Sequence, residues 1–393
     1  MMFTLLLDLD DTLLDTNLDA FLPAYFKKLA AHMSKNVPPD VFMKAMLKST
    51  QIMYSSTQVG KTLEQAFSSN FYPDLGYSQT ELAEEIDRFY DDVFPGLGYL
   101  STPRPEAIAF VEWAFSKGWN VAIATDPLFP RKAILHRLQW AGLSPEKYPF
   151  IFISDFHNFH YAKVSVAFYP EFLTMMDWDD QPVLMVGDSM ERDIIPSQKT
   201  GIPAFWLNLE PSNSDASIPS GGFNDLIAFL ETVDISCLVV DLKKPDSLLV
   251  FFQATPAIIH SLILADAKKE FSNTNSENDS SLLEIIRNFR ECEQEVNIPA
   301  LALFGYDPSS GATGQPAIEW DKNQRDIDMD LSDAFSQFSE VRARLLDFLK
   351  KKQPADWQQI AQHKVYGSIT LLDLVEKMVM RDREQIKLAK TAI

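Results

Sequence analysis

Five short, uninterrupted apolar runs in the first half of the chain constrain its fold more than any other feature. They lie at residues 3–7, 121–124, 150–153, 183–186 and 204–207. Continuous apolar runs are typical of strands in a parallel sheet that is buried on both faces. Between them, helical patterns occupy residues 105–116, 129–140, 166–176 and 192–199. This alternation predicts a doubly wound α/β fold with a parallel sheet.

One insertion interrupts the alternation. Between about residues 17 and 94 no strand pattern occurs, and apolar side chains such as Leu18, Phe21 and Tyr25 recur at helical spacing. We therefore predict a helical subdomain inserted directly after the first strand. Such a subdomain can serve packing alone, but its place beside the end of the first strand favours a lid over a site.

Polar side chains follow four of the predicted strands at their carboxyl ends. They are Asp8 and Asp10 after the first, Thr125 after the second, Lys163 beyond the third and Asp188 after the fourth. Taken singly, each has an ordinary explanation as a turn residue, a helix cap or a surface lysine. Because ligands bind outside the carboxyl ends of such strands, their order along the chain predicts one shared crevice.

These residue types match the needs of phosphoryl transfer. Asp8 can act as a nucleophile that forms an aspartyl-phosphate, and Asp10 can act as a general acid and base. Mg²⁺ prefers hard oxygen ligands, which Asp8, Asp188 and water would supply. Lys163 and Thr125 would bind the phosphoryl oxygens on which charge spreads in the transition state.

The same segments resemble the motifs of the haloacid dehalogenase (HAD) superfamily. The resemblance rests chiefly on the first run, Leu-Leu-Leu-Asp-Leu-Asp-Asp-Thr-Leu, and the last, Gly-Asp-Ser-Met-Glu-Arg-Asp. It implies a HAD-like hydrolase domain over residues 1–233, with a helical cap of the C1 type at about residues 17–94. It also implies that Asp10 is a metal ligand through its backbone, beside Asp8 and Asp188, and that Asp193 supports the metal site or Lys163.

Two positions depart from the family pattern. The family usually has Asn after the second-motif Thr and Pro after its Lys, whereas this chain has Asp126 and Val164. Neither position carries a group of the mechanism, so these departures concern substrate fit. An acid at the position of Asp10 separates phosphatases and phosphomutases from dehalogenases and transport ATPases.

The second half has a different pattern. Residues 245–265, 282–296, 331–350 and 369–390 predict four amphipathic helices and therefore a four-helix bundle over residues 240–393. This half resembles the DinB/YfiT bundle family, which characteristically binds a divalent metal with three histidines. The matching positions are Asn288, Arg381 and Gln385, so we expect a bundle without that metal. Packing, a homodimer formed through the bundle, and ligand sensing all remain open as its role.

Composition excludes several function classes. The 393 residues carry a formal net charge of −20, which disfavours nucleic acid and anionic membranes as partners. The only cysteines, Cys237 and Cys292, build no disulfide framework. The start of the chain has no signal-peptide pattern, and we expect no apolar run of about 20 residues after it. A cytoplasmic protein is therefore expected.

Together, these features predict a Mg²⁺-dependent phosphoric monoester hydrolase that acts on a small phosphorylated metabolite. A phosphomutase of the same superfamily is an alternative. Another is a regulatory or binding protein of two domains with a vestigial phosphatase site, although the complete set of polar residues argues against it. A third alternative, a thiol-dependent transferase whose active site lies in the bundle, is contradicted by the missing metal-binding histidines.

Overall fold

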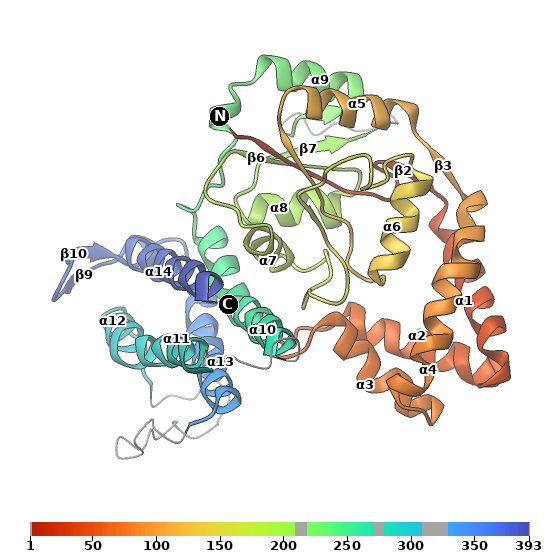
Figure 1. Cartoon of the computed structure of the whole chain (residues 1–393). Helices are drawn as coiled ribbons and strands as arrows, with labels where there is room; N and C mark the ends of the chain where they lie inside the picture. Colours follow the sequence, from red (N-terminus) through yellow and green to blue (C-terminus); the bar gives the residue numbers. More distant parts are fainter. Residues whose placement is uncertain (1, 209–217, 271–278, 309–328, 393) are drawn as a thin grey trace. The chain divides into compact units, whose positions relative to one another are not determined.

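The computed structural model describes residues 2–208, 218–270, 279–308 and 329–392. The chain forms two compact units, residues 1–240 and 241–393, and each is described by itself (Figure 1).

The first unit is built on a six-stranded sheet in the order β5-β4-β1-β6-β7-β8. All neighbouring strands pair in parallel. The strands are β1 (Thr4–Leu7), β4 (Asn120–Ile123), β5 (Phe152–Ile153), β6 (Val183–Gly187), β7 (Ala204–Leu207) and β8 (Ser220–Gly221). The predicted doubly wound parallel sheet is confirmed. The sequence pattern missed only β8, whose two residues form no apolar run.

Helices cover both faces of this sheet (Figure 1). They are α5 (Pro105–Ser116), α6 (Arg131–Trp140), α7 (Phe168–Met175), α8 (Ile195–Lys199) and α9 (Phe223–Thr232). Helices α5 and α9 lie on one face, and α7 and α8 lie on the other. Alternate strand residues such as Leu5, Leu7 and Val121 pack into one apolar core with α5, α6 and α9. Burial on both faces explains why the strand runs are continuously apolar.

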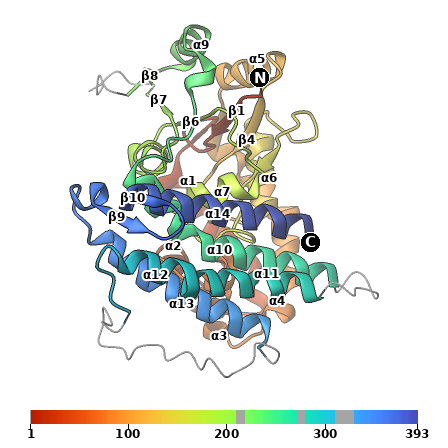
Figure 2. The same cartoon turned by 90° about the vertical axis from the view of Figure 1, so that its left-hand side faces the viewer.

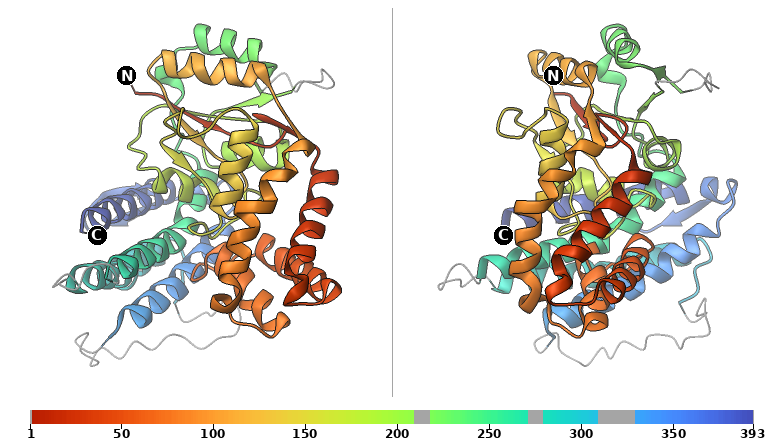
Figure 3. Two further views of the ribbon diagram at one scale, coloured as in Figure 1. Left: turned by 45° about the vertical axis from the view of Figure 1, so that its right-hand side comes forward. Right: turned by 90° about the vertical axis from the view of Figure 1, so that its right-hand side faces the viewer.

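The insertion after β1 is helical (Figure 3). It comprises α1 (Leu18–His32), α2 (Pro39–Tyr54), α3 (Leu63–Leu75) and α4 (Gln79–Arg88), with short 3-10 and π turns at Met33–Lys35, Phe89–Val93 and Phe94–Leu100. Capping boxes at Thr62 and Ser78 begin α3 and α4. The insertion joins the sheet domain through an antiparallel ribbon of β2 (Leu14–Thr16) and β3 (Ser101–Pro103), which the sequence patterns did not predict.

The second unit is predominantly helical, as expected (Figure 2). Its long helices are α10 (Pro245–Glu270), α11 (Asp279–Cys292), α13 (Leu331–Lys350) and α14 (Leu371–Ala392). A π turn at Glu293–Asn297 and the short α12 (Ile298–Ala302) continue α11. A hairpin of β9 (Ile360–His363) and β10 (Gly367–Thr370) precedes α14 and was not predicted.

Helix α10 corrects one expectation from the sequence. Its residues Pro245–Ala267 are long and apolar enough to cross a membrane by length and composition. Within this stretch, 61% of the most apolar window is buried, and α10 packs against α13 and α14. Partial burial of this kind is also seen in the core helix of a bundle, so the span is weak evidence for a membrane segment.

Candidate active site

The turn after β1 places two carboxylates at the carboxyl edge of the sheet. Asp8 follows the strand directly, and its backbone N–H donates to the carbonyl of Val186 on β6 at 3.0 Å. Asp11 adopts a left-handed conformation with φ of 57°, which Asp tolerates better than most residues. Its carboxylate accepts the Thr16 N–H at 3.1 Å, which closes the turn.

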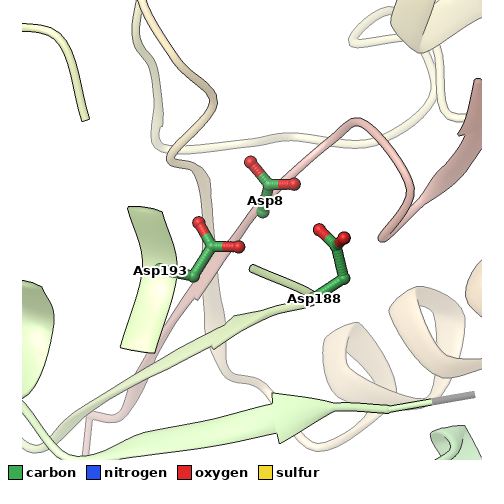
Figure 4. Close-up of side chains that lie close together, drawn as sticks. All are labelled: Asp8, Asp188 and Asp193. Carbon is green, nitrogen blue, oxygen red and sulfur yellow. The ribbon is translucent and has the colours of Figure 1, made fainter. Parts of the chain in front are cut away.

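Three aspartates converge at this edge (Figure 4). Asp8 follows β1, Asp188 follows β6, and Asp193 lies on the π turn Met190–Ile194. One carboxylate oxygen from each lies within 4.8 Å of the others. Among the described residues, this is the one group of three or more His, Cys, Asp or Glu side chains close enough to share an ion. Hard oxygen donors of this kind suit Mg²⁺.

Lys163 is buried against the same cluster. Its Nζ donates to Asp8 Oδ1 at 2.7 Å and forms an ion pair with Asp193. Its backbone N–H donates to the carboxylate of Asp126 at 3.0 Å, which anchors the loop after β5. Burial alone would lower the pKa of Lys163, but the carboxylates of Asp193 and Asp8 outweigh it and raise the pKa. Lys163 is therefore held as a cation beside Asp8.

Asp188 is fixed by a residue in the turn after β1 and by one on β7. Its backbone N–H donates to Thr12 Oγ1 at 3.1 Å, and Thr12 Oγ1 lies 3.3 Å from Asp188 Oδ1. The indole N–H of Trp206 on β7 donates to the Asp188 carbonyl at 2.8 Å. Burial raises the pKa of Asp188 to about 6, and the carboxylates of Asp8 and Asp11 act in the same direction. The positive charges near Asp188 therefore do not offset the cost of burying its ionised carboxylate beside other carboxylates.

Asp193 depends on a glycine at the end of β6. A β-carbon at Gly187 would lie 2.3 Å from the carboxyl carbon of Asp193, so no larger residue fits while Asp193 stays in place. The second carboxylate oxygen accepts the Ser189 N–H at 2.9 Å. Burial raises the pKa of Asp193 to about 7, even though Lys163 opposes this shift. Raised values at Asp188 and Asp193 indicate a centre that a divalent cation would neutralise.

Asp10 lies apart from the acidic cluster. Its carboxylate forms an ion pair with Arg137, a fully buried residue on α6. The guanidinium carbon lies 4.9 Å from the ring centre of Phe129 and 5.3 Å from that of Phe21. Burial lowers the pKa of Arg137 to about 9. The structure thus brings Asp8, Asp188, Asp193 and Lys163 together, and it pairs the Asp10 side chain with Arg137 on α6.

Thr125 is buried two residues after β4, and its carbonyl accepts the Ser154 hydroxyl at 2.7 Å. The next residue, Asp126, is one of the departures from the family pattern. Burial of its carboxyl raises the pKa of Asp126, although the Lys163 backbone N–H and Nζ oppose this. Asp126 is therefore a structural partner of the Lys163 loop.

Sequence reasoning assigned no role to Thr12 or Arg137. Thr12 stands within the first acidic run, but nothing local indicates a bond to a residue 176 positions away. The sequence could have indicated a role for Arg137, because this residue lies on the face of α6 that includes the buried Ile134 and Leu138. A charged residue on an apolar helix face calls for a buried partner.

The fold and the site define a class of doubly wound α/β proteins with an acidic centre at the carboxyl edge of the sheet. A sequence model of the haloacid dehalogenase-like hydrolases matches residues 3–199, which is half of the chain. The chain therefore belongs to the family of HAD-like hydrolases, which confirms the resemblance for the first unit. No curated protein sequence matches this chain.

Solved structures to which the chain is similar include a HAD phosphatase from Thermococcus onnurineus. It is 15% identical, with a TM-score of 0.39, and the match covers 58% of this chain and 98% of that one. A 2-haloacid dehalogenase from Pseudomonas syringae pv. Tomato DC3000 is 21% identical, with a TM-score of 0.41, and the match covers 59% and 99%.

Metal affinity at this centre should depend on pH. A carboxyl whose pKa is raised to about 6 holds its proton in the fold where the unfolded chain has lost it. Asp188 therefore contributes less to stability as the pH rises from its ordinary value of 3.8 through about 6. A cation must displace that proton, so we expect the dissociation constant for Mg²⁺ to rise by up to about tenfold per pH unit below 6.

Calorimetric titration with Mg²⁺ at about pH 8 and about pH 5 measures this dependence. Asp188→Asn should abolish binding at both, whereas Asp15→Asn, which alters an exposed carboxylate on β2, should change neither. Equal affinity at the two pH values would contradict the role of Asp188.

Proposed function

We propose that the protein is a Mg²⁺-dependent phosphatase that acts on a small phosphorylated metabolite through an aspartyl-phosphate on Asp8. The observation that carries the proposal is the position of Asp8. Its carboxylate lies beside those of Asp188 and Asp193 and accepts a hydrogen bond from the buried Lys163. Lys163 Nζ lies 2.7 Å from Asp8 Oδ1 and so stands beside the oxygens of a phosphoryl group that Asp8 would attack.

In this mechanism the chain's own residues divide the work. A carboxylate oxygen of Asp8 attacks phosphorus, the ester oxygen leaves, and Asp10 protonates it. Asp10 then takes a proton from the water that attacks the aspartyl-phosphate, which regenerates Asp8 and releases phosphate. Lys163 and Thr125 hold the phosphoryl oxygens. Asp8, Asp188 and the Asp10 carbonyl would hold Mg²⁺ with support from Asp193, and the ion would offset the charge of the phosphate.

The helical insertion would act as a lid that admits small substrates and keeps out bulk water. The net charge of −20 supports a function without nucleic-acid or membrane partners. We propose a cytoplasmic location because the two cysteines build no disulfide framework.

Asp10→Asn should lower turnover by about 10²–10⁴, because the amide neither gives nor accepts the proton. Release of inorganic phosphate from p-nitrophenyl phosphate in Mg²⁺ measures the effect and separates hydrolysis from phosphomutase transfer. EDTA should abolish the release, and added Mg²⁺ should restore it. The exposed Asp15→Asn is the matched control. Turnover that persists in EDTA would argue against the metal, and an unchanged Asp10→Asn would remove that residue from the mechanism.

For the second unit we propose a DinB-like bundle that is held together by buried ion pairs in place of a metal. Arg342 is buried and bonds Glu293 Oε1 at 2.7 Å and Asp382 Oδ2 at 2.6 Å. Arg381 donates to Asn297, and Asn288 is exposed on α11. A permanent guanidinium cation at one of the three matched positions supports a bundle without the family's metal.

A further inference from the structure

A cavity of about 280 Å³, partly open to solvent, lies between the helical insertion and the carboxyl edge of the sheet. Its volume is near the lower end of the range for small-molecule pockets. Asp10, Asp126 and Arg192 line it from the side of the sheet domain. The cavity therefore opens on the residue that would protonate the leaving group, so it is the space that the leaving group would enter.

The walls that the insertion contributes are mainly apolar. Leu22 and Phe26 of α1, Met46 of α2 and Phe67 of α3 line the cavity, and Phe129 adds an aromatic ring from the sheet domain. The charged side chains of Asp10, Asp126 and Arg192 line the end of the cavity next to the sheet domain, which we call its floor. A substrate whose hydroxyl groups pointed at these walls would lose its hydrogen bonds to water without replacement.

Several polar groups on the walls already have partners within the protein. The hydroxyl oxygens of Tyr25 and Tyr90 lie 2.7 Å apart, and both rings are buried. Burial raises the pKa of Tyr25 to about 12, so its hydroxyl stays neutral. Glu64 accepts from Gln79 at 3.1 Å and lies 2.9 Å from the ring nitrogen of His157. A few further hydroxyls line the walls, but most of the lining is apolar and offers few partners for the hydroxyls of a sugar ring; these further hydroxyls belong to Thr50, Ser68 and Tyr72.

The floor, in contrast, is charged. Arg192 adds a guanidinium, which is a permanent cation, beside the carboxylates of Asp10 and Asp126. Its Nε donates to Ser189 Oγ at 3.4 Å, which ties it to the loop that carries Asp188. A ligand with one charged end and one hydrocarbon end would match the cavity along its length.

We propose that the substrate is a phosphate monoester of an apolar alcohol, with a short alkyl chain or an aromatic ring. The phosphate lies at Asp8, the ester oxygen faces Asp10, and the hydrocarbon part fills the cavity against Leu22 and Phe67. This inference rests on the proposed phosphatase function and specifies its substrate class.

A homologous series tests it. The full-length protein with Mg²⁺ is assayed with n-alkyl phosphates from methyl to octyl, and with glycerol 3-phosphate and glucose 6-phosphate. We expect kcat/KM to rise about fourfold for each added methylene until the cavity is full. Hexyl phosphate should exceed glucose 6-phosphate by about 100-fold or more. Sugar phosphates turned over as well as hexyl phosphate would overturn the inference and leave the phosphatase function standing.

A matched pair of variants connects the effect to the cavity. Leu22→Gln places an amide on the cavity wall and should lower kcat/KM for hexyl phosphate by about tenfold or more. Leu47→Gln makes the same change at an exposed position of α2 and should have no effect. Equal effects of the two substitutions would overturn the inference.

Alkyl phosphonates, which cannot be hydrolysed, separate the two proposals. If hexyl phosphonate raises the melting temperature more than methyl phosphonate does while no ester is turned over, the phosphatase function fails and the apolar site stands. If chain length changes neither turnover nor melting temperature, the apolar site fails.

Discussion

Replacing Asp8 with asparagine should reduce phosphatase turnover by about 10⁴–10⁶ and leave the fold intact. The amide has nearly the same shape as the carboxylate but is a very poor nucleophile, so no aspartyl-phosphate can form. Lys163 would keep its ion pair with Asp193, and the backbone bond from Asp8 to Val186 does not involve the side chain. The loss should therefore be confined to chemistry.

Two measurements check this prediction. Acid-quenched wild-type protein should carry one phosphoryl group by mass spectrometry during turnover, and Asp8→Asn should carry none. Circular dichroism should show the same fold in both. Asp15→Asn, seven residues further along, should behave as wild type, since its side chain is exposed on β2. Wild-type turnover in Asp8→Asn would refute the nucleophile assignment.

The second large effect is expected in the bundle, where Arg342→Met should cost about 3–5 kcal/mol of stability. The substitution leaves Glu293 and Asp382 buried without their cation. Removing one partner of a buried ion pair destabilises a protein more than replacing the whole pair by apolar residues. Arg342 also lies 3.8 Å from the ring centre of Phe252. Methionine fills the space but restores neither the charge nor the four hydrogen bonds that Arg342 donates to Glu293, Asp382 and the carbonyl of Phe252.

Urea unfolding followed by a probe in the second unit measures the loss. Arg344→Met is the matched control, because Arg344 lies on the same helix, is partly exposed and forms an i,i+4 pair with the half-exposed Glu340. That pair should be worth less than about 1 kcal/mol. Removing Arg342, Glu293 and Asp382 together in favour of apolar residues should recover much of the stability. Similar small losses in both single variants would show that the buried network contributes little.

The strands of the first unit could be predicted because burial on both faces forces continuous apolar runs. The predicted run at residues 183–186 coincides with β6 (Val183–Gly187) to within one residue. The hairpin of β9 and β10 could not be predicted in this way, since Ile360 is exposed and only Ile369 of β10 is buried. Periodicity is visible only where a face is buried.

Some residues of the candidate site could likewise be predicted from the sequence, and others could not. Asp8, Lys163 and Asp188 could be placed together because the carboxyl ends of parallel strands meet at one edge. The partner of Asp10 could not, because Arg137 lies on a helix face and reaches Asp10 through the tertiary fold. The close approach of Asp193 to Gly187 likewise depends on the geometry of a π turn, which no sequence pattern indicates.

The ribbon of β2 and β3 has a mechanical consequence. The insertion leaves and re-enters the sheet domain through two strands that are hydrogen-bonded to each other, in the register Leu14 with Pro103 and Thr16 with Ser101. A paired ribbon bends more easily than its strands separate or slide, so the helices would rotate about this ribbon once the bonds from α3 to the loop after β5 open, such as that from the Leu63 N–H to the Phe159 carbonyl. Asp10 forms a bridge with Leu14 at the base of this ribbon. Asp10 therefore lies close to the axis of such a rotation, where atoms move least. Its distance to the sheet edge would change little with the angle of the insertion.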